Sequence, residues 1–217
     1  LQYDGSAWSE MTSATTERLW AVWGASQDAI FAVGDNGTIV RFDGTSWTAE
    51  NSGTTELLGA VWGTSATSVY AVGYNGTILD YDGAGNWVAM DNPAVGTGSR
   101  IHGIWGTSDS DIYATAYDDG AVLRWDGATW TTFGTSLPGW GIWGTSGSEI
   151  FAIAGSGSIS HYDGSSWTTQ DNLTTDHLHG VFGFSNAHVS VVGENGTIIR
   201  GYRGASVTVT PSSPATL

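Results

Sequence analysis

The sequence predicts an all-β protein, a five-bladed β-propeller with four antiparallel strands in each blade, and repetition along the chain is the main reason. An aromatic-Gly pair recurs at intervals of 39, 43, 38 and 39 residues. A repeat of about 40 residues without helical periodicity is typical of propeller blades and too long for leucine-rich repeats. The five pairs are Trp23-Gly24, Trp62-Gly63, Trp105-Gly106, Trp143-Gly144 and Phe182-Gly183.

Each repeat contains four short segments that read as strands, which we designate positions A to D. In the first repeat these are residues 19–24, 29–34, 38–42 and 46–49, which alternate apolar residues or are rich in β-branched and aromatic residues. Between B and C, Asn-Gly or Asp-Gly steps predict tight type I′ turns, because these residues tolerate a positive φ. These steps lie in Asp35-Asn36-Gly37, Tyr74-Asn75-Gly76, Asp118-Asp119-Gly120 and Glu194-Asn195-Gly196.

A second marker, an aromatic residue followed by Asp-Gly and then by Trp, indicates the turn from C to D. It occurs at Tyr3 to Trp8, Phe42 to Trp47, Tyr81 to Trp87, Trp125 to Trp130 and Tyr162 to Trp167. The first copy precedes the first complete repeat, and the last repeat lacks a copy with Trp. We therefore expect a terminal strand to close the ring. Either the N-terminal piece or residues 206–210 can serve, and closure removes free sheet edges.

A single propeller domain is expected over residues 1–204. Residues 205–217 then form a C-terminal strand and a Ser-, Thr- and Pro-rich tail, which could begin a linker to a following domain.

Composition restricts the function. The 217 residues include 21 Asp and Glu but only six basic residues, all Arg, which gives a net charge of −15. Such a charge repels phosphate backbones, so we expect no nucleic-acid partner. The absence of Cys and Lys excludes disulfides, thiol chemistry and Schiff bases. No apolar run is long enough for a membrane helix, so a soluble domain without membrane insertion is expected.

These turns and the Val-Trp-Gly strands resemble the repeats of bacterial secreted or cell-surface propellers, in the style of the Asp-box and kelch families. The number of blades is similar to that of tachylectin-type lectins. The resemblance implies a secreted or cell-surface location and a binding role. The Asp-box has one residue between its Asp and Gly where this chain has none, so no sialidase activity is implied, and no catalytic residue can be carried over.

Most of the 12 Trp residues recur once per repeat and are expected to pack blade against blade. Trp20 and Trp140 are the exceptions. Both occupy the position two residues before the Val or Ile of strand A, where the other repeats have Gly59, His102 and His179. The D–A and B–C connections emerge on one face of a propeller, so this variable position should meet the B–C turns there.

The predicted ligand site therefore combines aromatic rings, imidazoles and carboxylates. An alternative is that these side chains only fill the mouth of the central channel. The candidate residues are Trp20, His102, Trp140, His179, Asp35, Tyr74, Asp118 and Glu194.

No metal or other cofactor is predicted. His177-x-His179 beside Asp176 is compatible with a metal site but offers too few ligands. Asp109-x-Asp111 resembles the start of a calcium loop without its Gly and distal Glu, and is better explained as an A–B turn. A calcium requirement stays open. Arg41, Arg124 and Arg200 share one position in strand C and are interpreted as a structural stripe.

The sequence contains no signature of a reaction, so we expect a non-enzymatic binding module. The first hypothesis is a glycan-binding, adhesive domain of a secreted or cell-surface protein, because exposed Trp rings stack on sugars. The alternative is a propeller that binds proteins within a larger extracellular assembly. Because the variable position changes between repeats, one central or asymmetric site is expected rather than five equal ones.

Overall fold

The computed structural model describes residues 1–3, 5–96, 98–137, 139–170, 174–202 and 205–210. Within these residues the chain forms five four-stranded antiparallel sheets and one two-stranded sheet. This confirms the predicted all-β architecture with four strands per blade. None of the described helices, which are single 3₁₀ turns, has the length and apolarity to cross a bilayer.

The five sheets follow one another along the chain, and we number them blades 1 to 5. Blade 1 consists of β3 (Leu19–Ser26), β4 (Ala29–Gly34), β5 (Ile39–Phe42) and β6 (Trp47–Glu50). Blade 2 consists of β7 (Leu58–Ser65), β8 (Ser68–Gly73), β9 (Ile78–Tyr81) and β10 (Trp87–Ala89). Blade 3 consists of β11 (Ile101–Ser108), β12 (Asp111–Ala116), β13 (Ala121–Trp125) and β14 (Trp130–Thr135). Blade 4 consists of β15 (Gly141–Ser146), β16 (Glu149–Ile153), β17 (Ile159–Tyr162) and β18 (Trp167–Gln170). Blade 5 consists of β19 (Leu178–Ser185), β20 (His188–Gly193), β21 (Ile198–Tyr202) and β22 (Ala205–Thr210).

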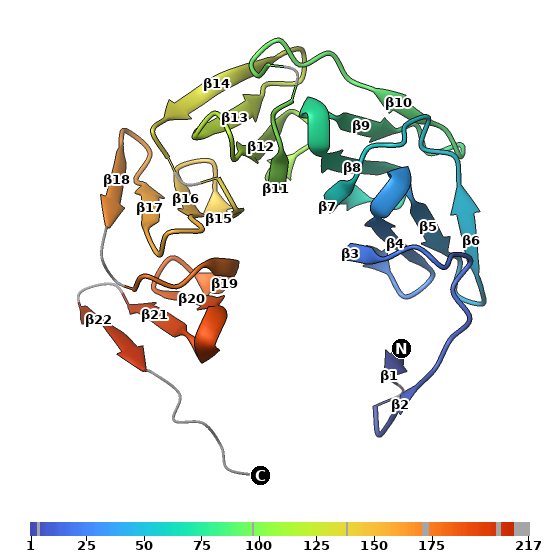
Figure 1. Ribbon diagram of the computed structural model, residues 1–217, viewed down its shortest axis with the longest axis horizontal. Coiled ribbons are helices and arrows are strands. Elements are labelled where there is room, and N and C mark those ends of the chain that lie inside the picture. Colours follow the sequence, from blue (N-terminus) through green and yellow to red (C-terminus); the bar gives the residue numbers. More distant parts are fainter. Residues whose placement is uncertain (4, 97, 138, 171–173, 203–204, 211–217) are drawn as a thin grey trace.

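The blades are arranged side by side around a central opening, with the first strand of each blade innermost (Figure 1). Neighbouring inner strands contact each other from β3 to β7, β11, β15 and β19. The second strand of a blade is buried between its neighbours, as Phe31, Tyr113 and Ile150 illustrate, each with no exposed surface. The core is therefore distributed between the blades rather than gathered in one centre.

The Trp residues of the Trp-Gly pairs hold successive blades together. A Cβ built on Gly63, Gly106, Gly144 or Gly183 would lie within 3.0 Å of the ring of the Trp in the preceding blade. The edge of the Trp ring thus lies against a position where only Gly leaves room. This confirms that the Trp residues of the Trp-Gly pairs pack blade against blade, whereas Trp8, which was expected to do the same, is 68% exposed.

The B–C turns follow the prediction in three blades. Asn36, Asn75 and Asn195 have φ between 51° and 59°, and each is followed by a Gly with positive φ. Both central residues of the turn are thus left-handed, as a type I′ turn requires. In blade 3 the prediction is wrong: only Gly120 has a positive φ, and the turn closes from the Gly120 N–H to the Tyr117 carbonyl. The central residues of this turn are Asp118 and Asp119, at the positions of Asn36 and Gly37, and neither has a positive φ.

The Asp-Gly turns between C and D also form as predicted. The Asp43 carboxylate accepts hydrogen bonds from the backbone N–H groups of Thr45 and Ser46, both at 2.8 Å. These bonds, that of Ser46 first, lower the pKa of Asp43. The equivalent bonds at Asp163 lower its pKa to about 2. Each turn thus delivers its Trp to the start of the outermost strand.

The two ends of the chain differ in what they contribute. Residues 205–210 form β22, which pairs with β21 and supplies the fourth strand of blade 5, so a C-terminal strand completes the last sheet. The alternative that the N-terminal piece completes it is wrong. Residues 2–3 (β1) and 8–9 (β2) form a separate two-stranded sheet, and Figure 1 shows an open arc with a gap between blade 1 and blade 5.

Candidate functional site

The residues at the variable position of strand A gather at one end of the central opening. Trp20, Gly59, His102, Trp140 and His179 line a single hollow of about 420 Å³ together with Tyr74 and Leu57. The inner strands converge there, so one residue from each of the five blades reaches the same space. The structure confirms that the five variable positions of strand A lie together, as the sequence predicted. Their role in binding a ligand stays a prediction.

Aromatic stacking fixes the wall of the hollow between blades 3 and 4. The imidazole of His102 stacks on Trp140 with ring centroids 4.4 Å apart and planes 14° apart. Tyr117 contacts both rings edge-on, at 5.6 Å from His102 and 5.5 Å from Trp140. His179 contacts Trp140 from blade 5 at 5.6 Å. Trp140 is thus the centre of a ring cluster that leaves it half-buried.

His102 is the most enclosed of the imidazoles in this cluster. Its burial, and then the nearby Arg100 guanidinium, lower its pKa from the ordinary value of 6.5. Its Nε2 atom is buried, and no described residue offers it a hydrogen bond. The uncharged form of the ring is therefore favoured at neutral pH.

Asp118, a predicted site residue, is held by Arg100 rather than free to face a ligand. Arg100 donates to both carboxylate oxygens, through Nη2 at 2.6 Å and Nε at 2.9 Å, and its backbone N–H adds a third bond. These bonds lower the pKa of Asp118 to about 2. The guanidinium also lies 4.7 Å from the Tyr117 ring centroid. The Arg100–Asp118 ion pair therefore packs beside Tyr117, next to the His102–Trp140 stack.

Blade 1 contributes the exposed rim of the site. Trp20 is 51% exposed, and its indole Nε1 donates to Asp35 at 2.6 Å. The Arg18 guanidinium lies 5.2 Å from the Trp20 ring centroid. On the opposite side, Glu194 lies 3.7 Å from Nε2 of His179. Of the predicted carboxylates, Asp35 and Glu194 therefore lie next to residues that line the hollow, although neither lines it.

Additional carboxylates on this face hold the B–C turns. Glu17, Glu56 and Asp176 each accept a hydrogen bond from the side chain of the Asn in the following turn, at 2.8 to 3.0 Å. This confirms that the D–A loops and B–C turns share one face. Acidic groups there outnumber the cations Arg18 and Arg100, so the face is negatively charged around an aromatic centre. The acidic residues are Glu17, Asp35, Glu56, Asp118, Asp119, Asp176 and Glu194.

Four residues of this neighbourhood were not among the predicted site residues: Leu57, Arg100, Tyr117 and His177. Leu57, Arg100 and His177 occupy one repeat position, directly before strand A, and the backbone carbonyl of each accepts a bond from the B–C turn of its own blade. This position could have been found in the sequence, because its residues vary between repeats as much as those at the position of Trp20 and Trp140. Tyr117 begins the B–C turn of blade 3, at the position of Asp35, Tyr74 and Glu194 in the other blades, because its N–H bonds the carbonyl before strand A as theirs do. The sequence analysis had placed Asp118, one residue later, at this position.

The other singled-out motifs are structural in the described residues. Asp109 accepts a bond from Ser68 of blade 2 at 2.7 Å, and Asp111 pairs with Arg124 at 2.9 Å. Arg41 donates to Tyr81 of the next blade at 3.0 Å, which supports the structural stripe. The part of the chain that the structure describes contains no group of three His, Asp or Glu side chains placed to hold a metal ion.

The fold is that of a β-propeller, as similar solved structures show. One is entitled YCF48 bound to D1 peptide, with a TM-score of 0.71 and 18% identity over 96% of this chain and 74% of that one. A second is the extracellular domain of the putative one component system BT4673 from B. thetaiotaomicron, with a TM-score of 0.70 and 11% identity over 91% of this chain and 31% of that one. A third is the WD40 β-propeller domain of Doa1, with a TM-score of 0.69 and 12% identity over 92% of this chain and 70% of that one.

At such identities these likenesses establish the fold alone. No protein-family model and no curated protein sequence matches the chain. The resemblance to Asp-box, kelch and tachylectin-type repeats is therefore supported only at the level of the propeller architecture.

Proposed function

We propose that this chain is a non-enzymatic binding module that holds a basic segment of a protein partner in the hollow of the loop face. The observation that carries the proposal is the combination of Trp20, Trp140 and Tyr74 around one hollow with Asp35 and Glu194 at its edge. Aromatic faces and carboxylates are the groups that attract a cationic side chain. The net charge of −15 favours the same kind of partner over long range.

The size of the hollow agrees with this ligand. About 420 Å³ accommodates one long side chain and part of the adjoining backbone. The half-exposed Trp20 offers a ring face at the entrance, and the His102–Trp140 stack closes the far side. The structure of YCF48, a propeller of similar shape, was solved with a peptide of D1 bound. That precedent supports a peptide ligand for this type of scaffold.

A titration with a short peptide tests the proposal. The probe is a fluorescein-labelled peptide with a single Arg among Gly and Ser, and its control carries citrulline, which has the same shape without the charge. We expect saturable binding of the Arg peptide, weakened about 2- to 30-fold by citrulline, as an interaction of about 0.5–2 kcal/mol implies. Asp35→Asn and Trp20→Ala should weaken the Arg peptide and leave the citrulline peptide less affected. Equal binding of both peptides, or none, contradicts the proposal.

A glycan is the second candidate ligand. Trp20 is exposed, and the Asp35 carboxylate beside it offers an acceptor for sugar hydroxyls. Intrinsic Trp fluorescence titrated with a glycan panel, with and without calcium, tests this. A saturable shift that Trp20→Ala with Trp140→Ala removes would favour the glycan, and no shift with any sugar would exclude it at the concentrations used.

We also propose that the domain acts outside the cell or on its surface. The Cys-free, acidic, Ser-, Thr- and Gly-rich composition supports this location, and one propeller of similar shape is an extracellular domain. Protease treatment of intact source cells is a direct check. Loss of the domain from intact cells supports the location, and its protection until lysis contradicts it.

A further inference from the structure

The N-terminal sheet repeats the outer half of a blade. Tyr3 pairs with Trp8, and their rings lie 5.3 Å apart with an angle of 39° between the planes. Phe42 and Trp47, at strands C and D of blade 1, have the same pairing, distance and angle. The β1–β2 sheet therefore corresponds to strands C and D of a further blade that lies before blade 1. Within the described residues no strands occupy its A and B positions.

The inner strand of blade 1 is uncovered on the side where those strands belong. Val22 is 67% exposed, whereas the equivalent Val61, Ile104 and Ile142 of blades 2 to 4 are 7–8% exposed. Gly24 is exposed as well. A Cβ built there would meet Ile30 and Ala29 of its own sheet first, and not the ring of a preceding blade. Blade 1 thus presents a Gly position that no Trp ring covers.

The N-terminal segment lies beside the same face. Leu1, directly before β1, lines a hollow together with Val22 of the inner strand and with Val40 and Trp47 of the outer strands of blade 1. Leu1 is 81% exposed and Val22 67% exposed, so the N-terminal residues leave this face open.

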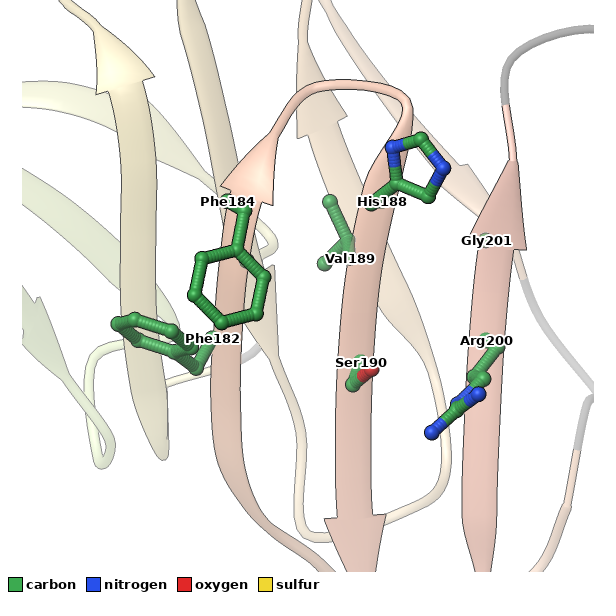
Figure 2. Close-up of a pocket in the computed structure, with 8 residues that line it drawn as sticks. Phe182, Phe184, His188, Val189, Ser190, Arg200 and Gly201 are labelled. Carbon is green, nitrogen blue, oxygen red and sulfur yellow. The ribbon is translucent and has the colours of Figure 1, made fainter.

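Blade 5 presents the opposite half of the interface. Phe182, the equivalent of the Trp residues that cover the next Gly, is 59% exposed, and Phe184 is 91% exposed. Figure 2 shows both rings beside β19, with Ser190 on β20 and Arg200 on β21, and all four residues line one hollow. Arg41, at the repeat position of Arg200, donates to Tyr81 of the next blade. The face of blade 5 thus carries the residues that contact the next blade elsewhere in the arc.

We infer that the gap between blades 5 and 1 is filled by two more blades of this same repeat, the second of which contains β1 and β2. Its strands A and B, and the whole of the blade before it, come from polypeptide outside residues 1–217. The width follows from the propellers of similar shape. This chain covers 74% and 70% of two of them, so 26% and 30% of those chains lie outside the match, close to the share that two blades have in a ring of seven.

Each contact at the new interfaces repeats one that the structure already shows four times. Phe182 covers the Gly of the first added blade, and the Trp of the second covers Gly24. The added strand B pairs with β1, so one blade joins both ends of the chain and closes the ring. Closure buries Phe184 and Val22 and removes the free sheet faces.

An extended chain tests the inference. A copy of residues 51–116, which supplies one blade and the A–B hairpin of another, is placed after Thr210 in place of residues 211–217. The matched control receives only residues 51–90, which lack the hairpin. We expect the amides of β1 and β2 to exchange with solvent at least tenfold more slowly in the longer variant, with Gly24→Leu cancelling the gain. Equal exchange in both variants would overturn the inference.

A second arm uses the unextended chain and does not depend on the added blades folding. The chain has no Cys, so Val22→Cys with Phe182→Cys introduces two thiols at exposed positions. The open gap predicts that both thiols stay free under mild oxidation. An intramolecular disulfide would show that five blades close directly, and an intermolecular one would show that a second copy occupies the faces. Either result would overturn the inference.

Discussion

The interfaces inside the arc and the two faces at its ends are made of the same repeat positions, yet they differ in burial. At the inner interfaces Trp62 lies on Gly106 and Trp105 lies on Gly144, and these Gly residues are buried. At the ends Gly24 and Phe182 are exposed. The Trp-Gly positions on the face of a blade are therefore buried only where a neighbouring blade covers them. Part of the free energy of folding thus comes from the interfaces between blades.

The largest expected effect is at an inner aromatic residue. Trp62→Ala removes the ring that lies between blades 2 and 3, and we expect a loss of about 3–5 kcal/mol in the free energy of unfolding. Phe182→Ala is the matched control at the end of the arc, with an expected loss below about 1 kcal/mol, because its ring is 59% exposed. Urea unfolding measures both. Similar losses would show that the end face is covered in solution.

The Gly side of the interface gives the second comparison. A Cβ at Gly106 would lie 2.7 Å from the Trp62 ring and 2.7 Å from the Asp111 carbonyl, so Gly106→Ala should destabilise by about 1–3 kcal/mol. At Gly24 the nearest atom would be Cγ1 of Ile30, 3.2 Å away and on a flexible side chain, so Gly24→Ala should change stability by less than about 0.5 kcal/mol. Thermal unfolding ranks the two variants. A reversed order would contradict the proposed packing.

A single hydroxyl gives a smaller effect. Tyr81→Phe removes the acceptor of the Arg41 hydrogen bond between blades 1 and 2, with an expected loss of about 1 kcal/mol. Tyr3 occupies the same repeat position in the N-terminal sheet, where its hydroxyl donates only to the nearby Gly5 carbonyl at 2.9 Å. Tyr3→Phe should therefore be close to neutral in urea unfolding. A loss at Tyr3 as large as that at Tyr81 would mean that Tyr3 already faces a neighbouring blade.

The smallest effect is the pH dependence of His102. Because burial lowers its pKa in the folded state, the unfolded chain binds a proton first as the pH falls. The contribution of neutral His102 is therefore fully present above pH 6.5, the ordinary pKa, and is lost as the pH falls toward the folded value. His102→Phe should flatten the stability profile below about pH 6.5, measured against wild type. An unchanged difference across that range would show that His102 is solvated.

The repeat could be derived from the sequence because its signals are local. Each Asp-Gly turn and each Asn-Gly step acts through its own backbone, so strand order, turn type and the shared loop face followed directly. Asp119 shows the limit, since the Asp119-Gly120 step resembles Asn-Gly but lies one residue later in its turn. Asp118 was expected to face a ligand, and its engagement by Arg100 depends on a distance between side chains that spacing does not reveal.

The repeat pattern also did not predict that blades 1 and 5 have uncovered faces. Five Trp-Gly or Phe-Gly pairs were counted as five blades of a closed ring, because the count says nothing of curvature. The N-terminal Tyr3 to Trp8 piece was recognised as part of a repeat, but its assignment to the last blade required the position that β22 occupies.

Residue-resolved hydrogen exchange of the 217-residue chain is the most direct test of the difference between inner interfaces and open ends. We expect the slowest exchange in β8 and β12, which are covered on both sides, and exchange at least tenfold faster in the inner end strands β3 and β19. Uniform protection across all five blades would contradict this, because it would show that the faces carrying Val22 and Phe182 are already covered.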